Sequence, residues 1–205
     1  MIRGKVHPEA TVGATRLAAF TDGVFAIAAT LLVLDLTTHA FGTIQSNDEM
    51  WGALAAMGPQ FFNFALSFLL LCLLWMTHVE QFEWIVRVDG VMIWLNNIRL
   101  LFIVVVPFAT GLTTEYSTYT AGRVLMPITF FLAILTSWLQ WSWAVRRRAD
   151  LMPDLPEGDA RAYGRGALSA VIISVVVVIV SPWIGSAAFL LFVFDGLLTR
   201  LLRGR

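Results

Sequence analysis

The sequence predicts an all-α membrane protein, with six transmembrane helices in a single domain that spans residues 1–205. Three observations predict this fold class. Hydrophobic residues make up 58% of the chain and the mean hydropathy is +0.76, which is above the range of ordinary water-soluble domains. The apolar residues fall into runs of about 20 residues, the length that a helix needs to cross the hydrocarbon core of a bilayer. Arginines and lysines gather at alternate ends of these runs, as in multi-pass proteins with basic cytoplasmic loops.

The apolar runs define six expected spans in one continuous set. They cover residues 16–38, 51–78, 91–113, 119–145, 166–180 and 183–202. The last two are short and are divided by Ser181-Pro182. Because proline lacks the backbone N–H that a helix interior uses, we expect a tight helical hairpin there rather than one long span. The polar linker over 146–165 carries Pro153 and Pro156 and is expected to be a solvated cytoplasmic loop.

The positions of the basic residues predict the orientation. The outer loops hold Asp48, Glu49 and Glu115, and no lysine or arginine before Arg123 opens the fourth span. The inner segments hold Arg3, Lys5, Arg16, Arg87, Arg146, Arg147, Arg148, Arg161, Arg165, Arg200, Arg203 and Arg205. Since cytoplasmic loops are enriched in lysine and arginine, both termini are expected in the cytoplasm.

The remaining composition excludes several function classes. The 14 basic residues balance 14 acidic ones, so no basic surface favours a nucleic-acid partner. Cys72 is the single cysteine, and one thiol can form neither an internal disulfide nor a thiolate metal cluster. The chain has no HExxH helix and no phosphate-binding Walker loop. We therefore expect no catalytic residue, no enzyme activity and no cofactor.

The first span carries charge at unusual depth. Asp22 lies one to two turns inside it and Asp35 lies near its other end, and an ionisable group within a membrane helix is costly enough to mark a structural or functional site. Ala26 and Ala29 share a side with Asp22. Small residues allow close helix packing, so this side is expected to pack on other helices of the same subunit.

A second side of the first span carries an aliphatic stripe. At about 100° per residue, one face collects Arg16, Phe20, Gly23, Ile27, Thr30, Leu31 and Leu34. Leucines at helical spacing more often face lipid or core. The other interpretation is that Ile27, Leu31 and Leu34 meet copies of themselves on a symmetry axis, where stacked aliphatic rings constrict a pore and exclude ions by dewetting.

The stretch from Arg16 to Asp35, with Phe20-Thr21-Asp22-Gly23 near its start, resembles the first-helix signature of the transmembrane protein 175 family. This family comprises potassium channels of lysosomes, bacteria and archaea. Thr21 stands where the usual signature has serine and retains the hydroxyl. The resemblance continues through Trp75 and His78 in the second span and Asn96 in the third, and ends near Pro107-Phe108.

The resemblance implies a homotetramer in the inner cell membrane of a prokaryote, whose first helices surround a central pore. It implies passive permeation of potassium and other monovalent cations, membrane lipids and copies of the chain as partners, no TVGYG filter, and no bound metal beyond permeating potassium. Ile27, Leu31 and Leu34 match the constricting positions, and Thr30 matches a threonine linked to potassium preference. The residues matching the structural polar network are Arg16, Thr21, Asp22, Trp75, His78 and Asn96.

Two predictions remain, one for the role of His78 and one for an alternative function. His78 has Glu80 and Glu83 nearby, but we expect its ring to hydrogen-bond Asp22 or a backbone carbonyl rather than to bind a metal. A coupled transporter remains the alternative to a channel, with Asp22 or Asp35 as a protonatable carrier site.

Overall fold

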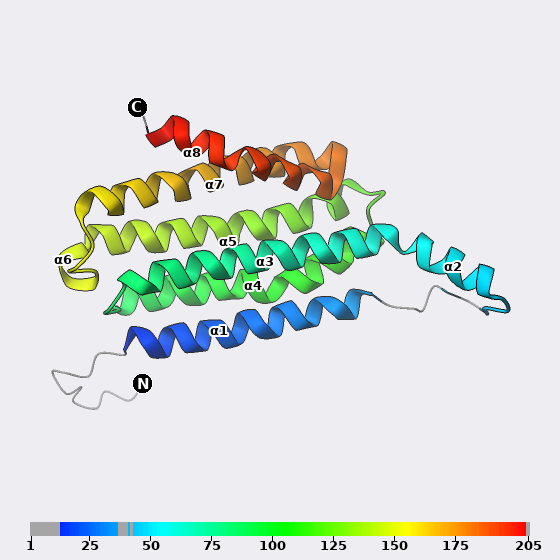
Figure 1. The fold of residues 1–205 in the computed structure, drawn as a ribbon, viewed down its shortest axis with the longest axis horizontal. Helices are drawn as coiled ribbons and strands as arrows, with labels where there is room; N and C mark the ends of the chain where they lie inside the picture. The colour runs from blue at the N-terminus through cyan, green and yellow to red at the C-terminus, as the bar shows by residue number, and fades with distance from the viewer. Residues whose placement is uncertain (1–12, 37–40, 42, 204–205) are drawn as a thin grey trace.

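The computed structural model describes residues 13–36, 41 and 43–203, and this part of the chain is helical apart from short connections (Figure 1). The predicted all-α fold class is confirmed. In chain order the elements are α1 (Ala14–Leu31), η1 (Leu32–Asp35), α2 (Asn47–Ala56), α3 (Gly58–Trp84), α4 (Gly90–Glu115), α5 (Thr120–Arg146), α6 (Arg148–Leu151), α7 (Glu157–Ile184), η3 (Gly185–Phe194) and α8 (Asp195–Arg203).

The long helices lie side by side in one bundle, with α1 along one edge and η3 and α8 along the other (Figure 1). Helix α4 packs on α1, α3 and α5, and α5 in turn packs on α7. The core between them is apolar and includes Phe25, Leu71, Ile103, Phe130 and Val177. Helices α3 and α4 thus both pack against α1 and hold it in place.

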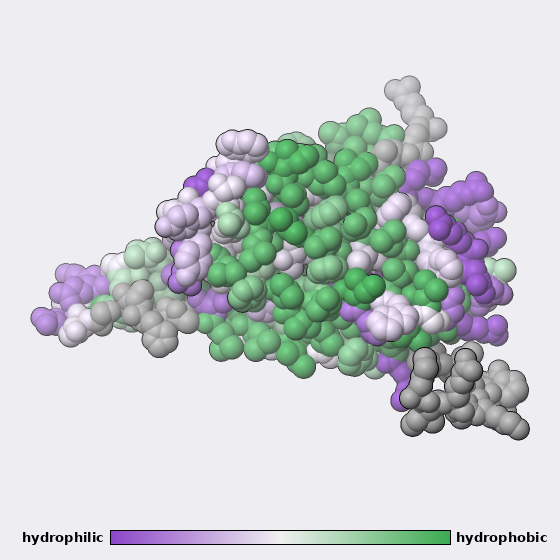
Figure 2. Space-filling view, turned by 180° about the vertical axis from the view of Figure 1, so that it is seen from behind, coloured by the Kyte–Doolittle hydropathy of each residue, from purple (hydrophilic) through white to green (hydrophobic). Residues whose placement is uncertain are grey.

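Five helical segments of the described chain are long and apolar enough to cross a membrane. They are Ala14–Asp35, Gly58–Trp84, Gly90–Glu115, Thr120–Arg146 and Glu157–Leu201. Figure 2 shows hydrophobic side chains across the middle of the molecule and hydrophilic ones towards its two ends. Such a belt suits hydrocarbon as the surrounding solvent, and the protein is a multi-pass membrane protein. Residues 37 and 38, the end of the first expected span, lie outside the described residues.

The fifth of these segments contains the expected hairpin, but its turn is displaced. Helix α7 continues through Pro182 to Ile184, and the chain reverses at Gly185, whose φ of 61° lies in the left-handed region (Figure 1). Glycine takes that conformation without a steric penalty. The expectation of a break at Ser181-Pro182 was wrong because Ser181 Oγ donates to the Val178 carbonyl at 2.9 Å. That carbonyl is the one that the missing N–H of Pro182 leaves free.

The second expected span begins later than Trp51. Helix α2 ends at Ala56, has no buried residue, and projects beyond the end of the bundle (Figure 1). Helix α3 then begins at Gly58 with Pro59 in its first turn. Proline suits this position because the first N–H groups of a helix have no partner within it.

The linker over 146–165 is not a solvated loop throughout. It contains α6 and the first turns of α7, and its Leu151, Met152 and Leu155 are buried. These side chains pack in a second core cluster with Ile85 and Trp141. Pro153 and Pro156 lie between α6 and α7, as expected, but the apolar residues around them pack the linker against the ends of α3 and α5.

Candidate functional site

Helix α1 and the η1 turn that follows it have one face buried against the bundle. The buried side chains recur every three or four residues and pack on α3 and α4: Ala14, Leu17, Thr21, Phe25, Ala28 and Leu32. That spacing follows from the helical repeat. The face that anchors the helix is thus centred on Thr21 and Phe25.

The opposite face of α1 and η1 is apolar and exposed. Ile27 is 61% exposed, Leu31 40% and Leu34 65%, and Thr30 is exposed among them. Thr30 Oγ1 donates to the Ile27 carbonyl at 2.8 Å, so the lone pairs of this hydroxyl oxygen remain free to face outward. The structure brings together the four residues expected at a pore, and no part of the described chain covers them.

The expectation that Ala26 and Ala29 pack on the other helices holds for Ala29 alone. Ala29 is half-buried and packs against the core, whereas Ala26 is exposed. Both line a surface groove of about 370 Å³ between α1 and α3, together with Asp22, Cys72 and Trp75. The buried face includes Phe25 and Ala28, and Ala26 lies outside it.

Two hydrogen bonds join the polar residues of α1 to its neighbours. Asn96 Nδ2 donates to Thr21 Oγ1 at 2.9 Å, and both side chains are fully buried. Trp75 Nε1 donates to Asp22 Oδ1 at 2.9 Å at the surface. One bond therefore ties α1 to α4 and the other ties it to α3. Gln140 of α5 extends the first contact by donating to Asn96 Oδ1 at 3.5 Å.

His78 does not make the expected hydrogen bond. It is 1% exposed, and neither ring nitrogen has a partner among the described residues. The ring lies instead between two aromatic side chains, with centroids 6.3 Å from Phe25 and 4.3 Å from Phe82. Asp22 faces Trp75 because it lies on the exposed side of α1, whereas His78 points into the bundle.

Arg16 lies apart from these contacts. It is exposed and forms no ion pair within the described residues. Of the six residues expected in the polar network, the structure joins Thr21 to Asn96 and Asp22 to Trp75. It leaves Arg16 and His78 outside those bonds.

Sequence reasoning missed Arg99, a fully buried arginine in the middle of α4. Its Nη2 donates to the Leu74 carbonyl at 2.7 Å, and the guanidinium carbon lies 5.6 Å from the centre of the Phe25 ring. A cation over an aromatic face is attracted to it, more strongly where water is excluded. The signal was an arginine inside an apolar run, which is itself a mark of a structural or functional position.

The η1 turn, which continues α1, packs on a glycine of α4. A Cβ atom built on Gly111 would approach Asp35 Oδ1 to 2.7 Å. Asp35 Oδ2 is buried and has no hydrogen-bond partner among the described residues. The lack of a side chain at Gly111 thus makes room for a carboxylate near the end of the first span.

In sequence, the chain is similar to proteins described as ion channels. A model of the family described as endosomal/lysosomal potassium channel TMEM175 matches residues 16–107. A potassium channel of Streptomyces collinus is 32% identical over 131 residues, 62% of this chain and 62% of that protein. The endosomal/lysosomal proton channel TMEM175 of Gallus gallus is 32% identical over 148 residues, 67% of this chain and 30% of that protein. Each match spans less than two thirds of the relative's length.

A solved structure extends the similarity to almost the whole chain. It is described as a lysosomal potassium-selective channel TMEM175 homolog from Chamaesiphon minutus. It superposes with a TM-score of 0.64 at 26% identity and covers 91% of this chain and 98% of that one. The family match itself covers α1 to the middle of α4, the part of the chain that holds the exposed stripe and the bonds at Thr21 and Asp22.

Proposed function

Because the chain belongs to the family of the endosomal/lysosomal potassium channel TMEM175, we propose that it forms a channel through which potassium passes passively across a membrane. Members of this family are ion channels rather than enzymes. The pore would be built by several copies of the chain around an axis, with α1 of each copy lining it.

The observation that carries this proposal is the exposed aliphatic stripe of α1. Ile27, Leu31 and Leu34 recur over consecutive turns, point away from the bundle, and belong to a helix whose opposite face is anchored. One helix cannot enclose a pore, so copies must be arranged symmetrically. We propose four, with the three side chains forming stacked rings that constrict the pore and block ions by dewetting when narrow.

Thr30 would supply the polar element of the pore. Its hydroxyl hydrogen is used by the Ile27 carbonyl, which leaves the oxygen as an acceptor that can replace part of an ion's hydration shell. Aliphatic rings offer no such replacement. Selectivity for potassium should therefore be modest and should depend on pore width and on the ring of Thr30 oxygens.

The hydrogen bonds at Thr21 and Asp22 would hold the pore helix at a fixed rotation. A turn of α1 about its axis would move the stripe off the pore and would break the bonds from Asn96 and Trp75. We propose that these residues act through the position of α1 and do not touch the ion.

We further propose that both termini face the cytoplasm and that the protein lies in the inner membrane of a prokaryote. The basic residues Arg87, Arg146, Arg147 and Arg148 lie at or just after the ends of α3 and α5 at one end of the bundle, and basic loops remain on the cytoplasmic side. The α7 to α8 hairpin at Gly185 would supply the fifth and sixth spans.

The test is ion flux through purified protein in liposomes that hold a potassium gradient, read with a voltage-sensitive dye. We expect a potential to develop without any counter-substrate, and protein-free liposomes to show none. Silent liposomes containing correctly folded protein would refute the channel.

A coupled transporter is the second candidate, because Asp35 Oδ2 is a buried carboxylate oxygen that has no hydrogen-bond partner among the described residues, and a carboxylate inside a membrane span can carry a proton. The same liposomes distinguish the two functions. A transporter would move potassium only together with a coupled movement of protons, which a pH-sensitive dye inside the liposomes would report, and its rate would saturate.

A further inference from the structure

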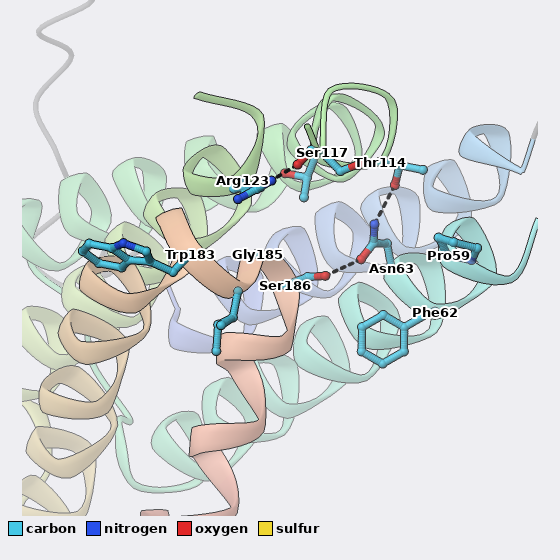
Figure 3. Close-up of a pocket in the computed structure, with 11 residues that line it drawn as sticks. Pro59, Phe62, Asn63, Thr114, Ser117, Arg123, Trp183, Gly185 and Ser186 are labelled. Carbon is cyan, nitrogen blue, oxygen red and sulfur yellow. Dashed lines mark hydrogen bonds between the residues drawn. The ribbon is translucent and has the colours of Figure 1, made fainter. Parts of the chain in front are cut away.

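A polar pocket lies at the end of the bundle where α3 begins, α4 ends and the α7 to η3 turn closes over them (Figure 3). Its volume is about 340 Å³. Asn63, Ser117, Arg123 and Ser186 supply its polar side chains, and Figure 3 shows them converging from separate elements. None of these residues belongs to the exposed stripe of α1 or to the contacts that anchor it.

The hydrogen bonds around the pocket leave an excess of donors. Asn63 is 6% exposed; its Nδ2 donates to Thr114 Oγ1 at 3.0 Å and its Oδ1 accepts from Ser186 Oγ at 2.7 Å. Arg123 donates from Nε to the Ser117 carbonyl at 2.6 Å and from Nη1 to the Pro182 carbonyl at 3.0 Å. These bonds fix both side chains in place.

Several N–H and O–H groups remain unused. Arg123 Nη2, one N–H of Asn63 Nδ2 and the Ser117 hydroxyl make no bond within the described part of the chain. The nearby hydroxyl hydrogens of Thr114 and Ser186 are already donated. A fixed guanidinium with free donors beside it is complementary to an oxyanion, to which charge-assisted hydrogen bonds are short and strong.

The pocket also lies at the depth of lipid headgroups. It opens where the apolar segments of α3, α4 and α5 end or begin, which is where the bilayer core gives way to the polar interface. Its rim is apolar and exposed: Phe62 is 45% exposed, Trp183 73% and Ile184 51%. Tryptophan is enriched at this level of membrane proteins.

Charge complementarity points to one occupant. Among the described residues that line the pocket, Arg123 is the one charged side chain, and Glu115 at the end of α4 is not part of the lining. We propose that the pocket binds the phosphate of a membrane phospholipid, with the phosphate at Arg123, Asn63 and Ser117 and the acyl chains over Phe62, Trp183 and Ile184.

The test is native mass spectrometry of the purified protein titrated with phosphatidylglycerol. We expect Arg123→Gln to weaken the binding of the lipid about tenfold, because it removes the cation. The matched control is Arg161→Gln, an exposed arginine near the start of α7 that pairs with Glu157, and it should bind as the parent does. Equal binding by both variants would overturn the proposal.

Arg123→Gln also removes two bonds to backbone carbonyls, so a variant that spares them is needed. Ser117→Ala keeps the carbonyl that Arg123 uses and removes only the free hydroxyl, and we expect about threefold weaker binding. If Arg123→Gln does not fold, unchanged binding by Ser117→Ala overturns the proposal.

Inorganic phosphate distinguishes a lipid from a soluble anion. Phosphate at millimolar concentration should leave the lipid bound, because it lacks acyl chains for the apolar rim. Displacement of phosphatidylglycerol by phosphate alone would overturn the lipid as occupant. Binding is read without ion flux, so this result is independent of whether the protein conducts.

Discussion

Thr21 is the residue whose contact most directly fixes α1. Its side chain is fully buried, and within the described residues its hydroxyl accepts the hydrogen bond that Asn96 Nδ2 makes. Within apolar surroundings an unpaired amide N–H costs more than the bond itself contributes. Loss of this bond would therefore destabilise the protein chiefly because it would leave the buried N–H of Asn96 Nδ2 unpaired.

Thr21→Val tests this contact, since valine keeps the shape and removes the hydroxyl. We expect a loss of about 1 kcal/mol or more in the free energy of unfolding, because Asn96 Nδ2 is left without an acceptor. Thermal unfolding in detergent measures it. Thr15→Val, at an exposed threonine of the same helix, should change little; equal effects in the two variants would contradict the role of Thr21.

Among the elements, the α4 to α5 turn brings the end of one helix into close contact with the start of the next. Thr113 Oγ1 donates to the Gly122 carbonyl at 2.7 Å, and a Cβ atom at Gly122 would collide with the Tyr116 carbonyl. A backbone group cannot move aside as the end of a side chain can. Gly122 thus allows α5 to begin directly against the last turn of α4.

Gly122→Ala should destabilise the protein by about 1–3 kcal/mol, the usual cost of overpacking. Gly52→Ala is the control, because a Cβ atom there has no neighbour within 4 Å and alanine favours a helix over glycine. Chemical or thermal unfolding of both variants gives the comparison. A stable Gly122→Ala protein would mean that α5 can shift without cost.

At the scale of the whole molecule, the role proposed for the exposed stripe depends on the assembly of several copies. Leu34 is 65% exposed and its neighbour Val33 is 53% exposed, but they point about 120° apart around the 3-10 helix η1. In the proposed tetramer one faces the pore axis and the other does not. A single chain offers no means of telling them apart by burial.

Leu34→Asn should therefore raise the conductance several-fold and reduce the preference for potassium, because a polar ring no longer expels water from the constriction. Val33→Asn is the matched control and should leave both properties unchanged. Planar bilayer recordings measure them, and the mass of the purified particle should be four times the 22.8 kDa of one chain. Equal currents in the two variants would remove Leu34 from the pore.

Much of the architecture was predictable because it depends on local properties. The length and hydropathy of the apolar runs predicted α1, α3, α4 and α5 and the presence of a final hairpin. The position of the hairpin was not predictable from Pro182 alone, because Ser181 satisfies the carbonyl that proline leaves free. The burial of Leu151 and Leu155 in the linker depended on Trp141, a partner close only in the folded chain.

By itself, then, the sequence determined that the protein is an all-α membrane protein and that its first span carries a polar motif beside an aliphatic stripe, because hydropathy and helical periodicity are properties of neighbouring residues. Only the tertiary structure decided that Asp22 pairs with Trp75 while His78 and Arg99 turn inward to Phe25. Those contacts depend on how α1 is rotated against α3 and α4, and that rotation is set by packing between segments far apart in the chain.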